Sequence, residues 1–131
     1  MIIVDRCFSE EMQFIGQNFN LDPKISINQI DSNQFQLRTT KGRTLILKQH
    51  TGRTLSKYFT HDNKNRGFYS EKFNELLETH QIEFRQNSVE CNFITSLIDD
   101  EKDLKNLKID KNKITFMLDS DMYEIYLQKV I

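Results

Sequence analysis

Residues 35–48 read Phe-Gln-Leu-Arg-Thr-Thr-Lys-Gly-Arg-Thr-Leu-Ile-Leu-Lys. Apolar and polar residues alternate on both sides of Gly42, which is the pattern of a β-hairpin with one buried face. A three-residue loop over 40–42 pairs Thr39 with Arg43, Leu37 with Leu45 and Phe35 with Leu47. A two-residue loop would instead place Lys48 opposite Phe35. Burial of the apolar face therefore predicts the three-residue loop, with Gly42 in the left-handed conformation of a bulged turn.

Similar alternation on both sides of this hairpin predicts further strands. The apolar positions of these strands are Ile25 and Ile27, then Ile82 and Phe84, then Val89, Cys91 and Phe93, and finally residues 107–109, 114–118 and 123–127. We expect a second hairpin over 82–93 with its turn at Gln86-Asn87, and a C-terminal meander with Asn112 in a tight turn. In all, the sequence predicts about seven antiparallel strands.

Two stretches have helical spacing instead. Phe8, Met12, Ile15 and Phe19 are spaced four, three and four residues apart, which predicts an N-terminal helix over 9–20 with Ser9 as its N-cap. A central helix over 70–79 would turn Phe73, Leu76 and Leu77 inward, and 55–59 would form one short helical turn. The expected fold class is α+β: antiparallel sheet packed with an N-terminal helix and a central helix.

Length and composition indicate a single folded domain over residues 1–131. The chain is 37% hydrophobic and 28% charged, as in folded globular proteins. No apolar run is long enough to span a membrane as a helix, and Asp5 and Arg6 interrupt what a signal peptide would need. We therefore expect a cytoplasmic protein. Cys7 and Cys91 are expected to be reduced and mostly buried, and a bridge between them depends on geometry.

The charge is distributed unevenly along the chain. The net charge is −1, yet residues 38–66 hold eight basic residues and one acidic residue, a local charge of +7. Such a block attracts phosphates, acidic protein surfaces or anionic lipid, unless the charges pair with the acidic remainder of the same chain. The candidate binding residues are Arg38, Arg43, Lys48, Arg53, Lys57 and Arg66.

Catalytic motifs are weak. His50 and His61 lie in the basic stretch and could serve as general acid and base of a metal-independent RNase. The sequence has no zinc-ligand spacing and no phosphate-binding loop, so we expect neither a metal nor a cofactor. Tyr58, Phe59, Phe68 and Tyr69 flank the basic stretch and are the candidates for stacking on bases.

These observations favour a small non-enzymatic protein-binding module, such as an inhibitor or immunity-type protein, whose basic patch contacts an acidic partner. The chain lacks Ala and Trp and is rich in Ile, Lys, Asn and Phe, which indicates AT-rich codons and a bacterial, phage or mobile-element origin. The alternative is binding of RNA or single-stranded DNA by the same patch, and RNase activity ranks below it. The sequence leaves the oligomeric state open.

Overall fold

The computed structural model describes residues 1–52, 55–59, 68–69, 72–73 and 77–128, with the backbone alone for 55–59, 68–69 and 77–78. In this part of the chain all regular structure is β. The chain divides into two compact units, Met1–Ile98 and Asp99–Ile131. None of the described residues forms a helix long and apolar enough to cross a membrane.

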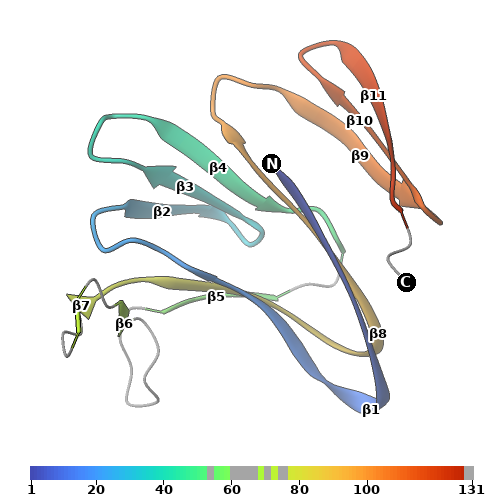
Figure 1. Cartoon of the computed structure of the whole chain (residues 1–131), viewed down its shortest axis with the longest axis horizontal. Helices are drawn as coiled ribbons and strands as arrows, with labels where there is room; N and C mark the ends of the chain where they lie inside the picture. Colours follow the sequence, from blue (N-terminus) through green and yellow to red (C-terminus); the bar gives the residue numbers. More distant parts are fainter. Residues whose placement is uncertain (53–54, 60–67, 70–71, 74–76, 129–131) are drawn as a thin grey trace. The chain divides into compact units, whose positions relative to one another are not determined.

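The N-terminal unit is built on one antiparallel sheet (Figure 1). Its strands are β1 (Ile2–Asn20), β2 (Ser26–Asp31), β3 (Gln34–Arg38), β4 (Thr44–Gln49), β5 (Leu55–Phe59) and β8 (Gln81–Asp99). Five of them follow the order β1-β8-β4-β3-β2, and β5 pairs with β8 beside that path. The short strands β6 (Phe68–Tyr69) and β7 (Leu77–Glu78) pair with each other.

The predicted hairpin is confirmed in its register. Its rungs pair Phe35 with Leu47 and Leu37 with Leu45, and the Thr39 N–H donates to the Arg43 carbonyl at 2.9 Å. Gly42 has a φ of 82°, which is the left-handed conformation that the three-residue loop requires. The hydrophobic pattern was sufficient here because only one register buries all the large apolar side chains.

The longest feature of the sheet is the ribbon formed by β1 and β8, which pair antiparallel over most of their 19 residues each. Both strands bend along their length, as Figure 1 shows. The register shifts between Phe8 and Gln13, where four residues of β1 stand against one residue of β8. Hydrogen bonds of the Ser9 hydroxyl with the Glu11 backbone shape this bulge.

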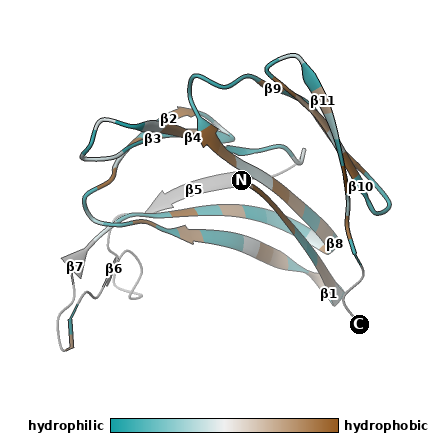
Figure 2. Ribbon diagram, turned by 45° about the horizontal axis from the view of Figure 1, so that its top comes forward, coloured by the Kyte–Doolittle hydropathy of each residue, from teal (hydrophilic) through white to brown (hydrophobic). Residues whose placement is uncertain are grey.

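The core gathers seven buried side chains from the hairpin and from β8. They are Phe35, Leu37, Leu47, Ile82, Phe84, Cys91 and Phe93. The rings of Phe35 and Phe19 both meet Phe84 edge to face, at centroid distances of 6.1 and 6.0 Å. The hydropathy colouring alternates along β1 and β8 (Figure 2), because successive strand residues point to opposite faces.

The predicted α+β class is wrong, because the described residues contain strands and no helix. Residues 9–20, predicted as the N-terminal helix, belong to β1, where Phe8 and Met12 are 75% and 65% exposed. Ile15 and Phe19, by contrast, pack against the core. The four-three-four spacing combines the two faces of a strand, because the three-residue step from Met12 to Ile15 crosses from the exposed face to the core face.

Three further predictions of local structure are wrong for related reasons. Residues 55–59, expected as a helical turn, form strand β5, and Leu77–Glu78 of the expected central helix form β7. Phe73, predicted to point inward, is 95% exposed. The expected turn at Gln86-Asn87 lies within the continuous strand β8, because β1 pairs with these residues. Parts of the 70–79 prediction, Leu76 among them, fall outside the described residues.

The C-terminal unit contains the predicted meander, which is confirmed. Strands β9 (Leu104–Asp110), β10 (Lys113–Leu118) and β11 (Asp121–Tyr126) form an antiparallel sheet in the order β11-β10-β9. The first turn passes through Lys111, with a φ of 51°, and Asn112, as expected. Asn106 has a φ of 54° at a register shift against β10, where β9 carries a bulge. The expectation of a single domain over 1–131 stays a prediction.

Candidate functional site

Four basic residues gather at one end of the β2-β3-β4 meander. Ser26, Arg38 and Thr44 lie side by side on the three strands, so the chain before β2 and the β3–β4 turn meet at this end. We define the basic end by its residues, which are Lys24, Arg38, Lys41 and Arg43, all exposed. Lys41 belongs to the basic stretch but was not among the predicted site residues, and neither was Lys24, whose position depends on the pairing of β2 with β3.

Lys48 lies at the other end of the hairpin. It pairs with Gln34, four residues along β3 from Arg38, which is about 13 Å at the usual rise of a strand. Its side chain is half-buried, whereas those of the basic end are exposed. The structure therefore brings Arg38 and Arg43 together and separates Lys48 from them.

The other predicted binding residues cannot be added to this surface. Arg53 and Arg66 fall outside the described residues, as does His61. The backbone of Lys57 pairs with Glu83 of β8, away from the hairpin turn. The stacking candidates Tyr58, Phe59, Phe68 and Tyr69 lie in β5 and β6, where the backbone alone is described.

Three of the four cations of the basic end are not paired with acidic side chains among the described residues. Ion pairs in this part of the chain include those of Arg85 with Glu83, Lys102 with Asp119, Lys105 with Asp103 and Lys113 with Glu124. Within the same part of the chain, Lys24, Arg38 and Lys41 form no ion pair. The nearest acidic residue in sequence, Asp22, accepts a hydrogen bond from the Lys24 backbone N–H at 2.8 Å. Three cations at the basic end thus remain available to a partner.

His50 is held in a partly buried position at the end of β4. Its Nε2 lies 2.7 Å from the hydroxyl oxygen of Ser96, which is 1% exposed. Burial, and secondarily the charge of Lys48, lowers the pKa of His50 from 6.5 to about 4. At neutral pH the ring is therefore uncharged, and it is a weaker base than an ordinary histidine.

A buried polar network, which the sequence patterns did not reveal, joins β1, β4 and β8. The Gln49 side chain is 1% exposed, and its amide nitrogen donates to Thr95 Oγ1 at 2.9 Å and to Gln17 Oε1 at 3.4 Å. Its amide oxygen accepts from the backbone N–H groups of Thr51 and Ile94, both at 3.1 Å. Since its donors and acceptor are satisfied, this network stabilises the strand packing and leaves no group aimed at a ligand.

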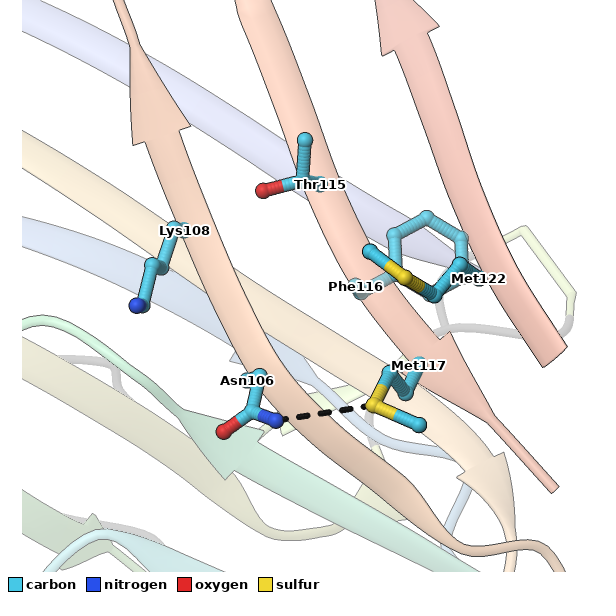
Figure 3. Close-up of a pocket in the computed structure, with 6 residues that line it drawn as sticks. All are labelled: Asn106, Lys108, Thr115, Phe116, Met117 and Met122. Carbon is cyan, nitrogen blue, oxygen red and sulfur yellow. Dashed lines mark hydrogen bonds between the residues drawn. The ribbon is translucent and has the colours of Figure 1, made fainter. Parts of the chain in front are cut away.

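The C-terminal unit has a shallow pocket of about 270 Å³ on the face of its sheet (Figure 3). Its lining residues are Asn106, Lys108, Thr115, Phe116, Met117 and Met122. The Asn106 amide donates to Met117 Sδ at 3.6 Å. One amine, two thioethers and a ring do not form an acid–base pair, and the volume is below that of usual small-molecule sites, roughly 300–1,000 Å³.

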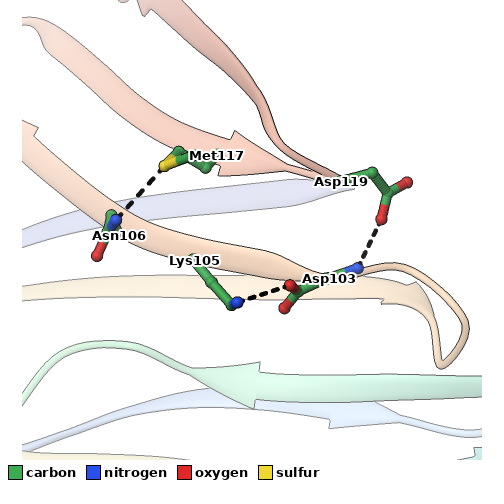
Figure 4. Close-up of polar contacts among 5 residues, drawn as sticks. All are labelled: Asp103, Lys105, Asn106, Met117 and Asp119. Carbon is green, nitrogen blue, oxygen red and sulfur yellow. Dashed lines mark hydrogen bonds and ion pairs between the residues drawn. The ribbon is translucent and has the colours of Figure 1, made fainter.

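The charged groups beside this pocket are paired with each other (Figure 4). Lys105 Nζ lies 2.9 Å from Asp103, and the Asp103 N–H donates to Asp119 at 2.9 Å. That backbone hydrogen bond and the Lys102 ammonium lower the pKa of the Asp119 carboxyl. These contacts fix the loops that precede β9 and follow β10. In the described part of the chain, no three His, Cys, Asp or Glu residues are grouped as a metal site requires.

Comparison of the chain with known protein families, with curated proteins and with solved structures finds no match to any of them. The basic end is therefore identified as the candidate functional site from its geometry alone.

Proposed function

We propose that this protein is a small non-enzymatic binding module, of the inhibitor or immunity type, whose basic end contacts an acidic surface on a partner protein. The observation that carries the proposal is the gathering of Lys24, Arg38, Lys41 and Arg43 at one end of the meander. In the free protein these like charges repel one another, and the approach of an acidic surface lowers the energy of that repulsion.

The scaffold beneath these cations supports a binding role. Phe35, Leu37 and Leu47 are at most 3% exposed, so the β3–β4 hairpin, whose end carries three of the cations, is anchored in the core. The Thr39–Arg43 and Gly42–Thr39 backbone hydrogen bonds, at 2.9 and 3.0 Å, close the turn. A surface held in this way loses little conformational entropy when it binds, and its charge accelerates association.

Nucleic-acid binding through the same cations is the alternative. It would need aromatic groups near the cations on which bases could stack. The aromatic side chain described on this hairpin, Phe35, is fully buried. RNase activity receives less support, because a histidine with a pKa of about 4 is a poor proton acceptor at neutral pH.

Charge reversal at the basic end tests the proposal. The double variant Arg38→Glu, Lys41→Glu is compared with wild type and with Lys105→Glu, Lys108→Glu, which reverses two exposed lysines of β9. Each immobilised protein is exposed to nuclease-treated extract of the native host and separately to mixed-sequence RNA. We expect wild type and the β9 variant to retain the same protein, and the basic-end variant to lose it.

Two results would overturn the proposal. One is retention of the same protein by all three chains, which would make the basic end irrelevant to binding. The other is RNA binding by wild type that decreases steeply with salt and is lost in the basic-end variant, with no protein retained after nuclease treatment. That second result would establish nucleic-acid binding instead.

A further inference from the structure

The two cysteines of the chain lie opposite each other in the β1–β8 ribbon. Cys7 and Cys91 are register partners, although 83 residues separate them in sequence. Both are free thiols, and burial together with the neighbouring Cys7 thiol raises the pKa of the Cys91 thiol to about 11. The sequence left their pairing open, because it depends on where two distant strands meet.

The hydrogen bonds at the end of the β1–β8 ladder show whether Cys7 and Cys91 form a hydrogen-bonded or a non-hydrogen-bonded pair. The Met1 ammonium donates to the Leu97 carbonyl, and the Leu97 N–H donates to the Met1 carbonyl, both at 2.8 Å. Hydrogen-bonded and non-hydrogen-bonded pairs alternate along an antiparallel ladder, and the register is unbroken from residue 2 to Phe8. Six positions from Met1, Cys7 and Cys91 therefore form a hydrogen-bonded pair.

The Cα separation of this pair type lies within the range of disulfides. The Cα atoms of hydrogen-bonded pairs are about 5.5 Å apart, and disulfides most often join Cα atoms roughly 5.5–6 Å apart. The Cβ atoms of directly opposite residues are about 4.5–5.5 Å apart, closer in non-hydrogen-bonded pairs, whereas a disulfide needs about 3.5–4.5 Å, so bond formation draws the two strands together locally and strains the bridge. The two thiols already meet on one face, since both pack in or against the same core.

The two thiols differ in their access to solvent. Cys91 is 2% exposed within the core, whereas Cys7 is half-buried on β1, which stands at one end of the strand order. The ladder breaks directly after Phe8, where four residues of β1 bulge out. A small reagent can thus reach Cys7 from the sheet edge, while Cys91 is shielded and can react through Cys7.

We propose that Cys7 and Cys91 form a reversible intramolecular disulfide by exchange with a low-molecular-weight disulfide such as oxidised glutathione. The Cys7 thiolate attacks one sulfur of glutathione disulfide, whose S–S bond breaks, and one glutathione thiol leaves. Cys91 then loses its proton, and its sulfur attacks Cys7 Sγ of the mixed disulfide, which releases the second glutathione thiol. Two protein thiols are oxidised, and one disulfide is reduced to two glutathione molecules.

The test treats the reduced full-length protein with oxidised glutathione and follows intact mass without reductant. We expect a monomer lighter by two hydrogen atoms, with a cross-linked peptide that holds Cys7 and Cys91 after digestion. Reduction with dithiothreitol should restore the original mass. In Cys91→Ser the reaction should stop at a glutathione adduct on Cys7, and Cys7→Ser should react at least tenfold more slowly than that variant.

The wild-type measurement decides the outcome even if a serine variant fails to fold. A glutathione adduct that persists on wild-type protein would overturn the proposal, because it would show that Cys91 cannot reach Cys7. Disulfide-linked dimers without the internal bridge would overturn it as well, since they would show that the thiols meet other chains more readily than each other.

Discussion

At the residue scale, two glycines that each precede the same three residues differ in backbone conformation, although neither is restricted by packing. Gly42 and Gly52 both precede Arg-Thr-Leu, and a Cβ on either would meet no described atom within 4 Å. Gly42 has a φ of 82°, whereas Gly52 lies outside the left-handed region. The two glycines thus differ in backbone conformation although the same three residues follow each of them.

The variant Gly42→Ala should therefore lower the free energy of unfolding by about 1–2 kcal/mol, the cost of placing an L-residue in the left-handed region. Gly52→Ala should change it by less than about 0.5 kcal/mol, as expected for a surface position without special geometry. Urea denaturation of both variants measures the difference. Equal losses would mean that the bulged turn does not hold Gly42 in this conformation.

The lowered pKa of His50 predicts that the free energy of unfolding decreases as the pH falls. Its pKa is about 4 in the folded protein and 6.5 as the ordinary value, so between these pH values the unfolded chain binds more protons. Stability from this group is complete above pH 6.5 and is lost as the pH falls toward 4. Allowing for partial exposure, the loss is on the order of 2 kcal/mol.

The measurement compares urea unfolding at pH 7 and pH 4.5 in wild type and in His50→Gln, whose amide can still hydrogen-bond Ser96. Wild type should lose more stability on acidification than the variant. If both lose the same amount, the pH dependence arises from other groups, and the buried position assigned to His50 is wrong.

At the element scale, the prediction from sequence succeeded where contacts are local. The β3–β4 hairpin and the C-terminal meander join neighbouring segments through short turns, and side-chain alternation alone fixes their registers. It failed for β1 because the partner strand, β8, is distant in sequence and because the four-three-four spacing combines residues of both faces of the strand. Ile15 and Phe19 face inward and Phe14 outward, a distinction that spacing alone does not give.

A substitution in the polar network that joins β1, β4 and β8 tests this strand packing. Gln49→Leu would leave the N–H groups of Thr51 and Ile94 without the amide oxygen that both now use, though Ile94 keeps Thr51 Oγ1 at 3.1 Å. Unpaired buried groups cost about 1–3 kcal/mol each, so we expect a loss of about 2–4 kcal/mol.

Gln36→Leu is the matched control, because Gln36 lies on β3 of the same hairpin and is only half-buried. Its free energy of unfolding should change by less than about 0.5 kcal/mol. Chemical denaturation of the two variants supplies the comparison. Similar values for both would contradict a role for the Gln49 amide in holding the three strands together.

At the scale of the whole molecule, the charge pattern shows what a linear sequence can and cannot predict about a site. The basic stretch correctly singled out Arg38 and Arg43 as neighbours, because both belong to one hairpin. The predicted site residues did not include Lys41 of the same turn or Lys24, which joins them through the β2–β3 pairing. They also grouped Lys48 with residues at the far end of the strands. Clustering in space depends on register, which charge counts do not contain.

The Cys7–Cys91 bridge would act on the whole N-terminal unit, because it closes a loop of 85 residues, counted from Cys7 to Cys91. Loop-closure entropy for that length sets an upper limit of about 4–5 kcal/mol on the added stability. Oxidised protein should accordingly unfold at a temperature higher than reduced protein, by up to about 15 °C. Thermal melts of the two forms, with Cys7→Ser treated by the same oxidant as control, measure this. An unchanged or lower unfolding temperature in the oxidised form would mean that strain in the bridged strands offsets the entropy gained, and would mark the disulfide as one that is easily reduced.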